Sequence, residues 1–222
     1  MSEAAVHGHA GAHGEHRFLA HHFASLERQV DASRLGMWLF LSTEVLLFVG
    51  LFVAYSVYRY SFPNAWAQAS RHSEIWAGTT NTFVLITSSL TVALAIHFAR
   101  ENKPRIAALM LAITLVFGLV FMCIKGIEYW NHFHEGALPG KYYHLHEVTL
   151  PGVSMYWSLY FLMTGLHGLH VLIGMTVLAV CMYRVLHGYY DSGYYVGLEL
   201  GGLYWHLVDL IWIFLFPLLY LV

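Results

Sequence analysis

Five titratable side chains stand near the middle of apolar stretches of this sequence. They are Glu44, His167, His170, His206 and Asp209. If such a stretch crosses a membrane, an ionised group at its centre costs on the order of 3 kcal/mol or more. Because of this cost, Glu44 must be protonated, paired or open to a polar cavity. His167 and His170 are three residues apart, as are His206 and Asp209. This spacing places both members of each pair on one face of an α-helix.

Carboxyl and imidazole groups that meet at one depth could do three kinds of chemistry. Imidazole is a common metal ligand, and a bis-histidine haem could use two of the histidines at 97, 167, 170 and 206. The same groups could relay protons. They could also satisfy one another in a buried structural network, which is the commonest use of such groups and is the interpretation we favour.

Four further charged residues need a role. Lys125 and Glu128 are three residues apart near the end of an apolar stretch, and we expect an interfacial ion pair whose lysine extends toward the headgroups. Arg59 and Arg71 flank apolar stretches on a common side, where we expect them to meet lipid phosphates. Glu44 is included with them as a lipid-facing candidate.

The elements that position these residues follow from composition. Of 222 residues, 58% are hydrophobic and only 11% are charged, against about 25% charged in a soluble domain. The net charge of -2 gives no basic field for nucleic acid. Residues 148–183 contain no charged side chain, whereas the strands of a membrane β-barrel alternate apolar and polar residues. We therefore predict an all-α membrane protein.

A helix needs about 20 residues to cross the bilayer. Five stretches are long enough: residues 35–58, 75–99, 106–130, 154–183 and 198–221. We predict a polar, histidine-rich tail over 1–34 and a five-helix bundle over 35–222. Lys and Arg are more frequent on the side of the N-terminus, which predicts a cytoplasmic N-terminus and a C-terminus outside.

Several stretches resemble subunit III of the haem–copper terminal oxidases. In chain order, the first is Met37-Trp38-Leu39-Phe40-Leu41-Ser42-Thr43-Glu44, followed by Asn81-Thr82 and His97 in the next apolar stretch. The others are Lys125-Gly126-Ile127-Glu128-Tyr129, Leu159-Tyr160-Phe161-Leu162-Met163-Thr164-Gly165-Leu166-His167-Gly168-Leu169-His170-Val171 and Tyr204-Trp205-His206-Leu207-Val208-Asp209-Leu210-Ile211-Trp212. Each motif is weak alone, but together and in order they are specific. Longer members of the family have two more N-terminal helices, so this chain resembles the five-helix form.

The resemblance implies an accessory subunit of a proton-pumping cytochrome c oxidase, which reduces oxygen to water in the bacterial plasma membrane. Such a subunit has no catalytic residue, no metal, no haem and no copper of its own. It packs on catalytic subunit I and other subunits that hold the haems and copper, protects subunit I during turnover, supports proton uptake and binds phospholipid. Glu44 matches the family's carbodiimide-reactive carboxyl. Because the family uses the matching histidines without a metal, the resemblance disfavours a haem site here.

Two alternatives remain at this point. The chain could be the same subunit of a quinol oxidase or of a relative linked to nitric oxide reductase. It could also belong to another class, as a stand-alone haem-binding or proton-coupled membrane protein.

Overall fold

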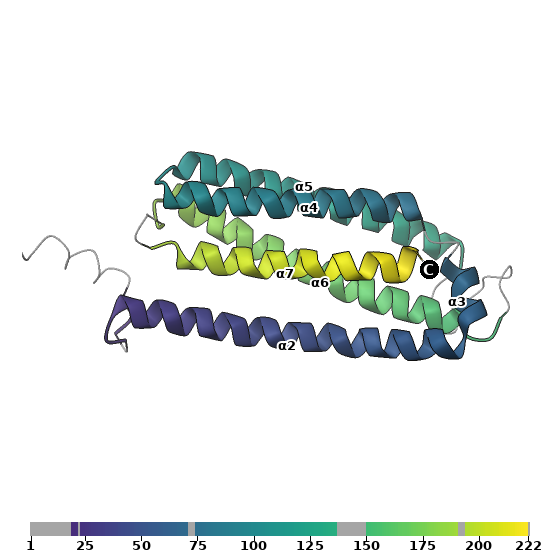
Figure 1. Cartoon of the computed structure of the whole chain (residues 1–222). Coiled ribbons are helices and arrows are strands. Elements are labelled where there is room, and N and C mark those ends of the chain that lie inside the picture. Colours follow the sequence, from purple (N-terminus) through teal and green to yellow (C-terminus); the bar gives the residue numbers. More distant parts are fainter. Residues whose placement is uncertain (1–18, 22, 71–73, 137–149, 191–193, 222) are drawn as a thin grey trace, which may run out of the picture. The chain divides into compact units, whose positions relative to one another are not determined.

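The computed structural model of the chain describes residues 19–21, 23–70, 74–136, 150–190 and 194–221. Within these ranges the secondary-structure elements are all α-helices (Figure 1): α2 (Leu26–Ser61), α3 (Pro63–Ser70), α4 (Ile75–Arg100), α5 (Pro104–His134), α6 (Val153–Leu186) and α7 (Val196–Tyr220). All of these except α3 are long and apolar enough to span a membrane. The prediction of an all-α protein with five membrane-spanning helices is therefore confirmed.

Helix α2 begins within the segment that we expected to be a polar tail. The Ser25 side chain accepts a hydrogen bond from the backbone N–H of Arg28, at 3.4 Å, which is the usual interaction of a helix N-cap. Glu27 lies in the first turn, where the helix dipole favours a negative charge. Residues 26–34 are therefore helical.

The chain divides into two compact units, Met1–Ser42 and Thr43–Val222. In the second unit, α4, α5, α6 and α7 lie side by side in a closed ring (Figure 1): α4 packs on α5 and α7, and α6 packs on the same two helices. The short helix α3 packs on α6. This ring carries most of the residues that the sequence analysis selected.

The tight turn between α4 and α5 makes these two helices antiparallel neighbours. Asn102 adopts a positive φ of 56°, a conformation that asparagine tolerates better than most residues. Pro104 follows at the first position of α5, where its missing N–H removes no helical hydrogen bond. Deeper in the pair, the hydroxyls of Thr91 and Thr114 are hydrogen-bonded at 2.7 Å, so a buried polar contact also joins the two helices.

Tryptophans fill the interior of the ring. Trp205 is fully buried and donates a hydrogen bond from Nε1 to the Ser88 hydroxyl at 3.1 Å. It fits because α6 has a glycine beside it: a Cβ added to Gly174 would lie 2.9 Å from the Trp205 ring. Small residues of this kind let membrane helices approach closely.

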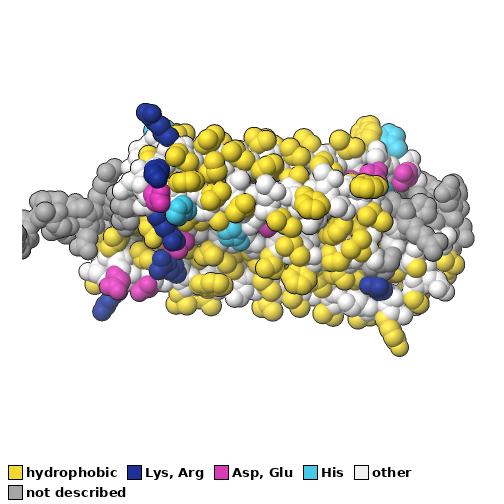
Figure 2. Space-filling model, turned by 45° about the horizontal axis from the view of Figure 1, so that its top comes forward, with side chains coloured by type: hydrophobic (Ala, Val, Ile, Leu, Met, Phe, Trp, Pro, Cys, Tyr) yellow, Lys and Arg dark blue, Asp and Glu magenta, His cyan; other side chains and the backbone are white. Residues whose placement is uncertain are grey.

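The outward faces of the helices are largely apolar. Exposed side chains include Leu46, Phe83, Leu119, Leu162 and Ile213. Figure 2 shows apolar side chains over the middle of one face, with charged side chains gathered mainly toward one end. A surface of this kind suits contact with lipid or with other membrane helices.

Candidate functional site

Glu44 on α2 and His170 on α6 are in direct contact. Nε2 of His170 lies 2.8 Å from Oε2 of Glu44, and Nδ1 lies 2.8 Å from the carbonyl oxygen of Leu166, one turn earlier on α6. The His170 side chain is almost buried, and the Glu44 side chain is 18% exposed. Phe48, one turn beyond Glu44, packs edge-on against the imidazole at 5.3 Å. This contact is a polar connection between α2 and α6.

The two hydrogen bonds of His170 determine how many protons the pair holds. A carbonyl oxygen only accepts, so Nδ1 must carry a hydrogen. Nε2 then either accepts a hydrogen from a protonated Glu44 or, in an imidazolium ring, donates one to the Glu44 carboxylate. In both cases the pair shares one proton and has no net charge, which suits a place among membrane-spanning helices.

The other pair that the sequence analysis selected lies on α7 and has a different partner. Nδ1 of His206 is 2.7 Å from the hydroxyl of Ser89 on α4. Asp209 is buried, and neither of its carboxyl oxygens makes a hydrogen bond within the described residues. The His206–Ser89 contact therefore joins α7 to α4 rather than to α2.

His167 stands alone in an aromatic environment. It is fully buried, and among the described residues neither ring nitrogen makes a hydrogen bond. Its ring lies 5.6 Å from Phe121 and 5.2 Å from Trp212. The five mid-span residues therefore do not form one continuous network in this structure. They are distributed over a pair between α2 and α6, a contact between α4 and α7, and an isolated imidazole.

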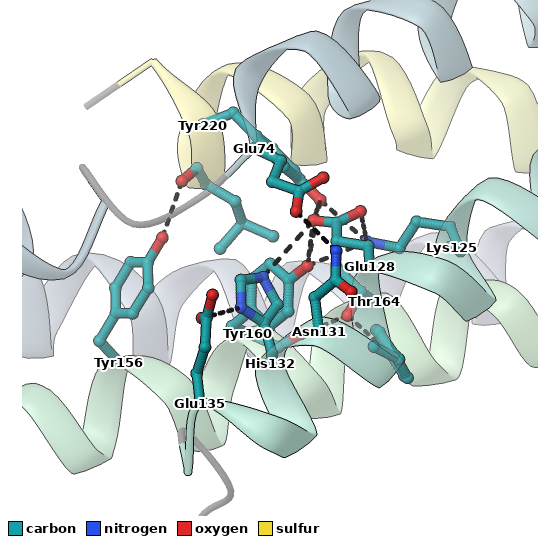
Figure 3. A network of polar contacts seen from close by, with 12 residues as sticks. Glu74, Lys125, Glu128, Asn131, His132, Glu135, Tyr156, Tyr160, Thr164 and Tyr220 are labelled. Atoms are coloured by element: carbon teal, nitrogen blue, oxygen red, sulfur yellow. Dashed lines mark hydrogen bonds and ion pairs between the residues drawn. The ribbon is translucent and has the colours of Figure 1, made fainter. Parts of the chain in front are cut away.

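The most complete polar site lies farther along the bundle, around Lys125 and Glu128 on α5 (Figure 3). The Lys125 ammonium lies 3.0 Å from Oε2 of Glu128. It also donates hydrogen bonds to the hydroxyls of Tyr160 on α6, at 3.1 Å, and Tyr220 on α7, at 2.8 Å. Both hydroxyls in turn donate to Oε1 of Glu128. We call these four residues the Lys125 cluster.

Every donor of the Lys125 cluster has an acceptor. An ammonium group has three hydrogens, and Lys125 uses them on one carboxylate and two hydroxyls. The ammonium also lies between 5.1 and 5.5 Å from the ring centroids of four aromatic residues, namely Tyr129, Tyr160, Trp212 and Tyr220. Cation–π attraction adds to the hydrogen bonds. The cluster therefore connects α5, α6 and α7 through hydrogen bonds.

The surroundings of the Lys125 cluster differ from those we expected. The Lys125 and Glu128 side chains are only 8% and 0% exposed, so the lysine does not extend toward the headgroups but turns into the bundle. The cause is the supply of hydroxyl and aromatic partners from α6 and α7. Sequence reasoning did not identify Tyr160 or Tyr220 as members, although Tyr160 lies within one of the motifs.

Arg59 lies beside a cavity at the end of α2. The cavity has a volume of about 460 Å³ and is lined by Tyr55, Ser56, Arg59, Tyr60, Pro63, Ala67 and Leu218. The Tyr55 hydroxyl donates a hydrogen bond to the Leu218 carbonyl oxygen and so closes one wall. Arg71, the second expected lipid contact, lies outside the described residues.

The histidines considered as haem ligands have different environments. His97 is exposed near the end of α4, with Nε2 3.2 Å from Glu101. Both ring nitrogens of His170 are occupied by Glu44 and Leu166. Within the described ranges, no group of three His, Cys, Asp or Glu side chains is arranged to hold a metal ion.

Comparison with known proteins places this chain in one family. A family model for cytochrome c oxidase subunit III matches residues 11–222. Cytochrome c oxidase subunit 3 of Cyprinus carpio and that of Danio rerio are each 32% identical over 218 residues, and that of Latimeria chalumnae is 31% identical over 221 residues. Each of these alignments covers 93% of this chain and 74% of the relative. Together with the five spans, these similarities show that the chain is a multi-pass membrane protein belonging to the cytochrome c oxidase subunit III family.

Proposed function

We propose that this chain is an accessory subunit of a cytochrome c oxidase, that it carries no redox centre, and that it stabilises catalytic subunit I and supports proton uptake. The observation that carries the proposal is the match to subunit III over residues 11–222. Haems and copper belong to partner subunits in this proposal. The largely apolar outer faces of the helices are consistent with a chain that packs against other membrane subunits.

The Glu44–His170 pair is the part of this chain that we connect with proton uptake. It holds one shared proton between α2 and α6, with 2.8 Å between Oε2 and Nε2. Movement of that proton between the two groups leaves the net charge of the pair unchanged. The pair therefore holds a shared proton among apolar side chains with no net charge, and it connects Glu44 on α2 with His170 on α6.

Bound phospholipid is the second part of the proposal. The guanidinium of Arg59 is always charged and lines a cavity large enough for a headgroup, about 460 Å³. Tyr60 and Ser56 line the same cavity. We propose that Arg59 binds a lipid phosphate there, with Arg71 as a second contact and Glu44 facing lipid farther along α2.

For the location we propose a bacterial plasma membrane with the N-terminus in the cytoplasm and the C-terminus outside. Five spans place the α4–α5 turn on the same side as the N-terminus. That turn carries Arg100, Lys103 and Arg105. The excess of Lys and Arg on this side agrees with the positive-inside rule.

The test is purification in mild detergent through a tag on this chain, followed by subunit masses and a reduced-minus-oxidised spectrum. We expect large co-purifying subunits with haem absorbance, and a colourless chain once those subunits are removed. The complex that lacks the chain should lose activity faster during turnover. A copper-containing partner subunit indicates cytochrome c as the electron donor, and its absence indicates a quinol. A lone 25.3 kDa chain that retains haem would overturn the proposal.

A further inference from the structure

Three ionisable residues continue from the Lys125 cluster toward the end of α5. Glu128, His132 and Glu135 follow one another at spacings of four and three residues, which places them along one face of the helix. Glu128 and His132 are 0% and 1% exposed, whereas the Glu135 side chain is 51% exposed. The row therefore leads from the buried cluster to an exposed carboxyl, and Figure 3 shows its three side chains.

His132 lies between two carboxyl groups. Nδ1 is 3.2 Å from Oε2 of Glu135, and Nε2 is 3.9 Å from Oε1 of Glu128. Within the described residues, Nε2 makes no hydrogen bond although it is buried. In a neutral imidazole only one nitrogen carries a hydrogen. Whichever nitrogen that is, an added proton makes both nitrogens donors, and each then faces a carboxylate.

Charged and aromatic side chains from several elements surround His132. On its own helix it faces Glu128 and Glu135, and Lys125 is already bonded to Glu128 on the far side. From α6 the rings of Trp157 and Tyr160 pack on the imidazole, at 4.7 and 5.6 Å. The Tyr220 hydroxyl of α7 is bonded to Glu128, and Glu74, ahead of α4, is bonded to Asn131. Among the described residues, the charged groups around His132 are therefore the carboxyls of Glu74, Glu128 and Glu135 and the ammonium of Lys125.

We propose that His132 is a proton-binding site, which takes up a proton from solvent by way of Glu135 and holds it between Glu135 and Glu128. In this reaction a proton leaves water at the exposed carboxylate, and the imidazole becomes imidazolium. The Lys125–Glu128 ion pair stays intact because Lys125 uses Oε2, whereas His132 faces Oε1. The site is independent of the Glu44–His170 pair, which lies on other helices.

The test is mass-spectrometric measurement of deuterium exchange at the imidazole C2–H in the intact complex, because this exchange proceeds through the charged ring. His167 is the internal control, since it is equally buried in the same bundle but has no hydrogen-bond partner in the described chain. At one fixed neutral pH we expect His132 to exchange measurably, and His167 to exchange far more slowly. If His132 exchanges as slowly as His167, the proposal is wrong, and this comparison needs no variant.

A matched pair of variants then tests the route through Glu135. In Glu135→Gln we expect the exchange rate of His132 at a fixed neutral pH to fall by about 3-fold or more, because a neighbouring carboxylate favours the charged ring. Glu101→Gln is the control, since it removes the carboxyl partner of His97 at 3.2 Å. This variant should change the exchange rate of His97 and leave that of His132 unchanged. An unchanged rate at His132 in Glu135→Gln would overturn the route that we propose.

Discussion

The Lys125 cluster and the mid-span residues His167 and Asp209 are buried in the same ring of helices, yet their hydrogen bonding differs completely. Lys125 and Glu128 are bonded to each other and to two tyrosine hydroxyls. His167 and Asp209 make no side-chain hydrogen bond within the described residues. All four side chains are almost inaccessible. Burial by itself therefore does not distinguish a structural polar residue from one with a different role.

The difference follows from what each group can do when water is removed. A single imidazole or carboxyl can lose its charge, so it can remain buried with few partners at a moderate cost, about 1–3 kcal/mol. A lysine and a glutamate that stay ionised need hydrogen bonds for every remaining donor and lone pair. The cluster meets this requirement because α5, α6 and α7 each contribute, and so it acts as a cross-link between three helices.

The largest effect should come from breaking the ion pair on one side. Glu128→Gln leaves the Lys125 ammonium buried without a carboxylate, and we expect the subunit to lose about 3–5 kcal/mol of stability. The measurement is the thermal midpoint and the yield of the assembled complex in detergent.

The double substitution Lys125→Met with Glu128→Leu is the matched control for this prediction. It removes both charges and so should be less destabilising than Glu128→Gln alone, although two tyrosine hydroxyls lose partners. If Glu128→Gln is as stable as the parent, the buried Lys125 ammonium does not need the Glu128 carboxylate. Lys125 and His167 would then no longer differ in their need for a hydrogen-bond partner.

A smaller effect should come from the Glu44–His170 pair, because one neutral hydrogen bond can replace the shared proton. In Glu44→Gln the amide N–H can donate to Nε2 of His170, and we expect a change within about 1 kcal/mol. In Glu44→Leu that nitrogen has no donor, and we expect a loss of about 1–3 kcal/mol.

Carbodiimide labelling provides the second measurement on the same variants. The label should disappear from position 44 in both Glu44→Gln and Glu44→Leu while the complex still assembles. Equal stability of the two variants would show that the hydrogen bond to His170 contributes nothing, and labelling that persists in them would assign the reactive carboxyl to another residue.

The smallest effect should come from a charged pair outside the membrane-spanning segments. The hydrogen bond from Lys103, at 2.7 Å, lowers the pKa of the Glu101 carboxyl below its usual value. The ionised form is then favoured in the folded state. The resulting stabilisation is present above the ordinary pKa of glutamate, about 4.3, and is lost as the pH falls further.

Thermal midpoints of the parent complex and of Glu101→Gln test this expectation. They should differ slightly at neutral pH, converge in acid, and converge also in high salt, which screens exposed pairs. A difference that grows as the pH falls would mean that folding does not favour the ionised Glu101 carboxylate. The exposed pair thus provides the reference against which the buried cluster is compared.

Much of the fold could be predicted from the sequence because each membrane-spanning helix corresponds to a continuous run of apolar residues. The start of α2 could not, since the polar residues around Ser25 form a helix through local capping rather than through an apolar stripe. For the polar residues, the spacing of three places Lys125 and Glu128 on one face of α5. It does not say how far α6 and α7 are rotated, and that rotation brings Tyr160 and Tyr220 to the cluster.

The same limit explains the mid-span residues. Similar depth along three separate helices suggested a single network. In the structure His170 faces α2, whereas His206 faces Ser89 on α4. The two histidines of the α6 motif, at 167 and 170, also have different neighbours, because three residues along a helix correspond to a rotation of about 300° rather than a full turn. Only the packing of neighbouring helices decides which of them finds a carboxyl.

The composition of the Lys125 cluster has a consequence for the order in which the chain enters the membrane. Tyr160 and Tyr220 lie 35 and 95 residues beyond Lys125, so the ribosome makes α5 before either hydroxyl exists. Glu128 is only three residues away and can neutralise Lys125 within the newly inserted helix. When Tyr160 and Tyr220 have been made, their hydroxyls can add two hydrogen bonds to the Lys125–Glu128 pair. The hydrogen bonds of Lys125 are thus complete only after α6 and α7 have been made and have packed against α5.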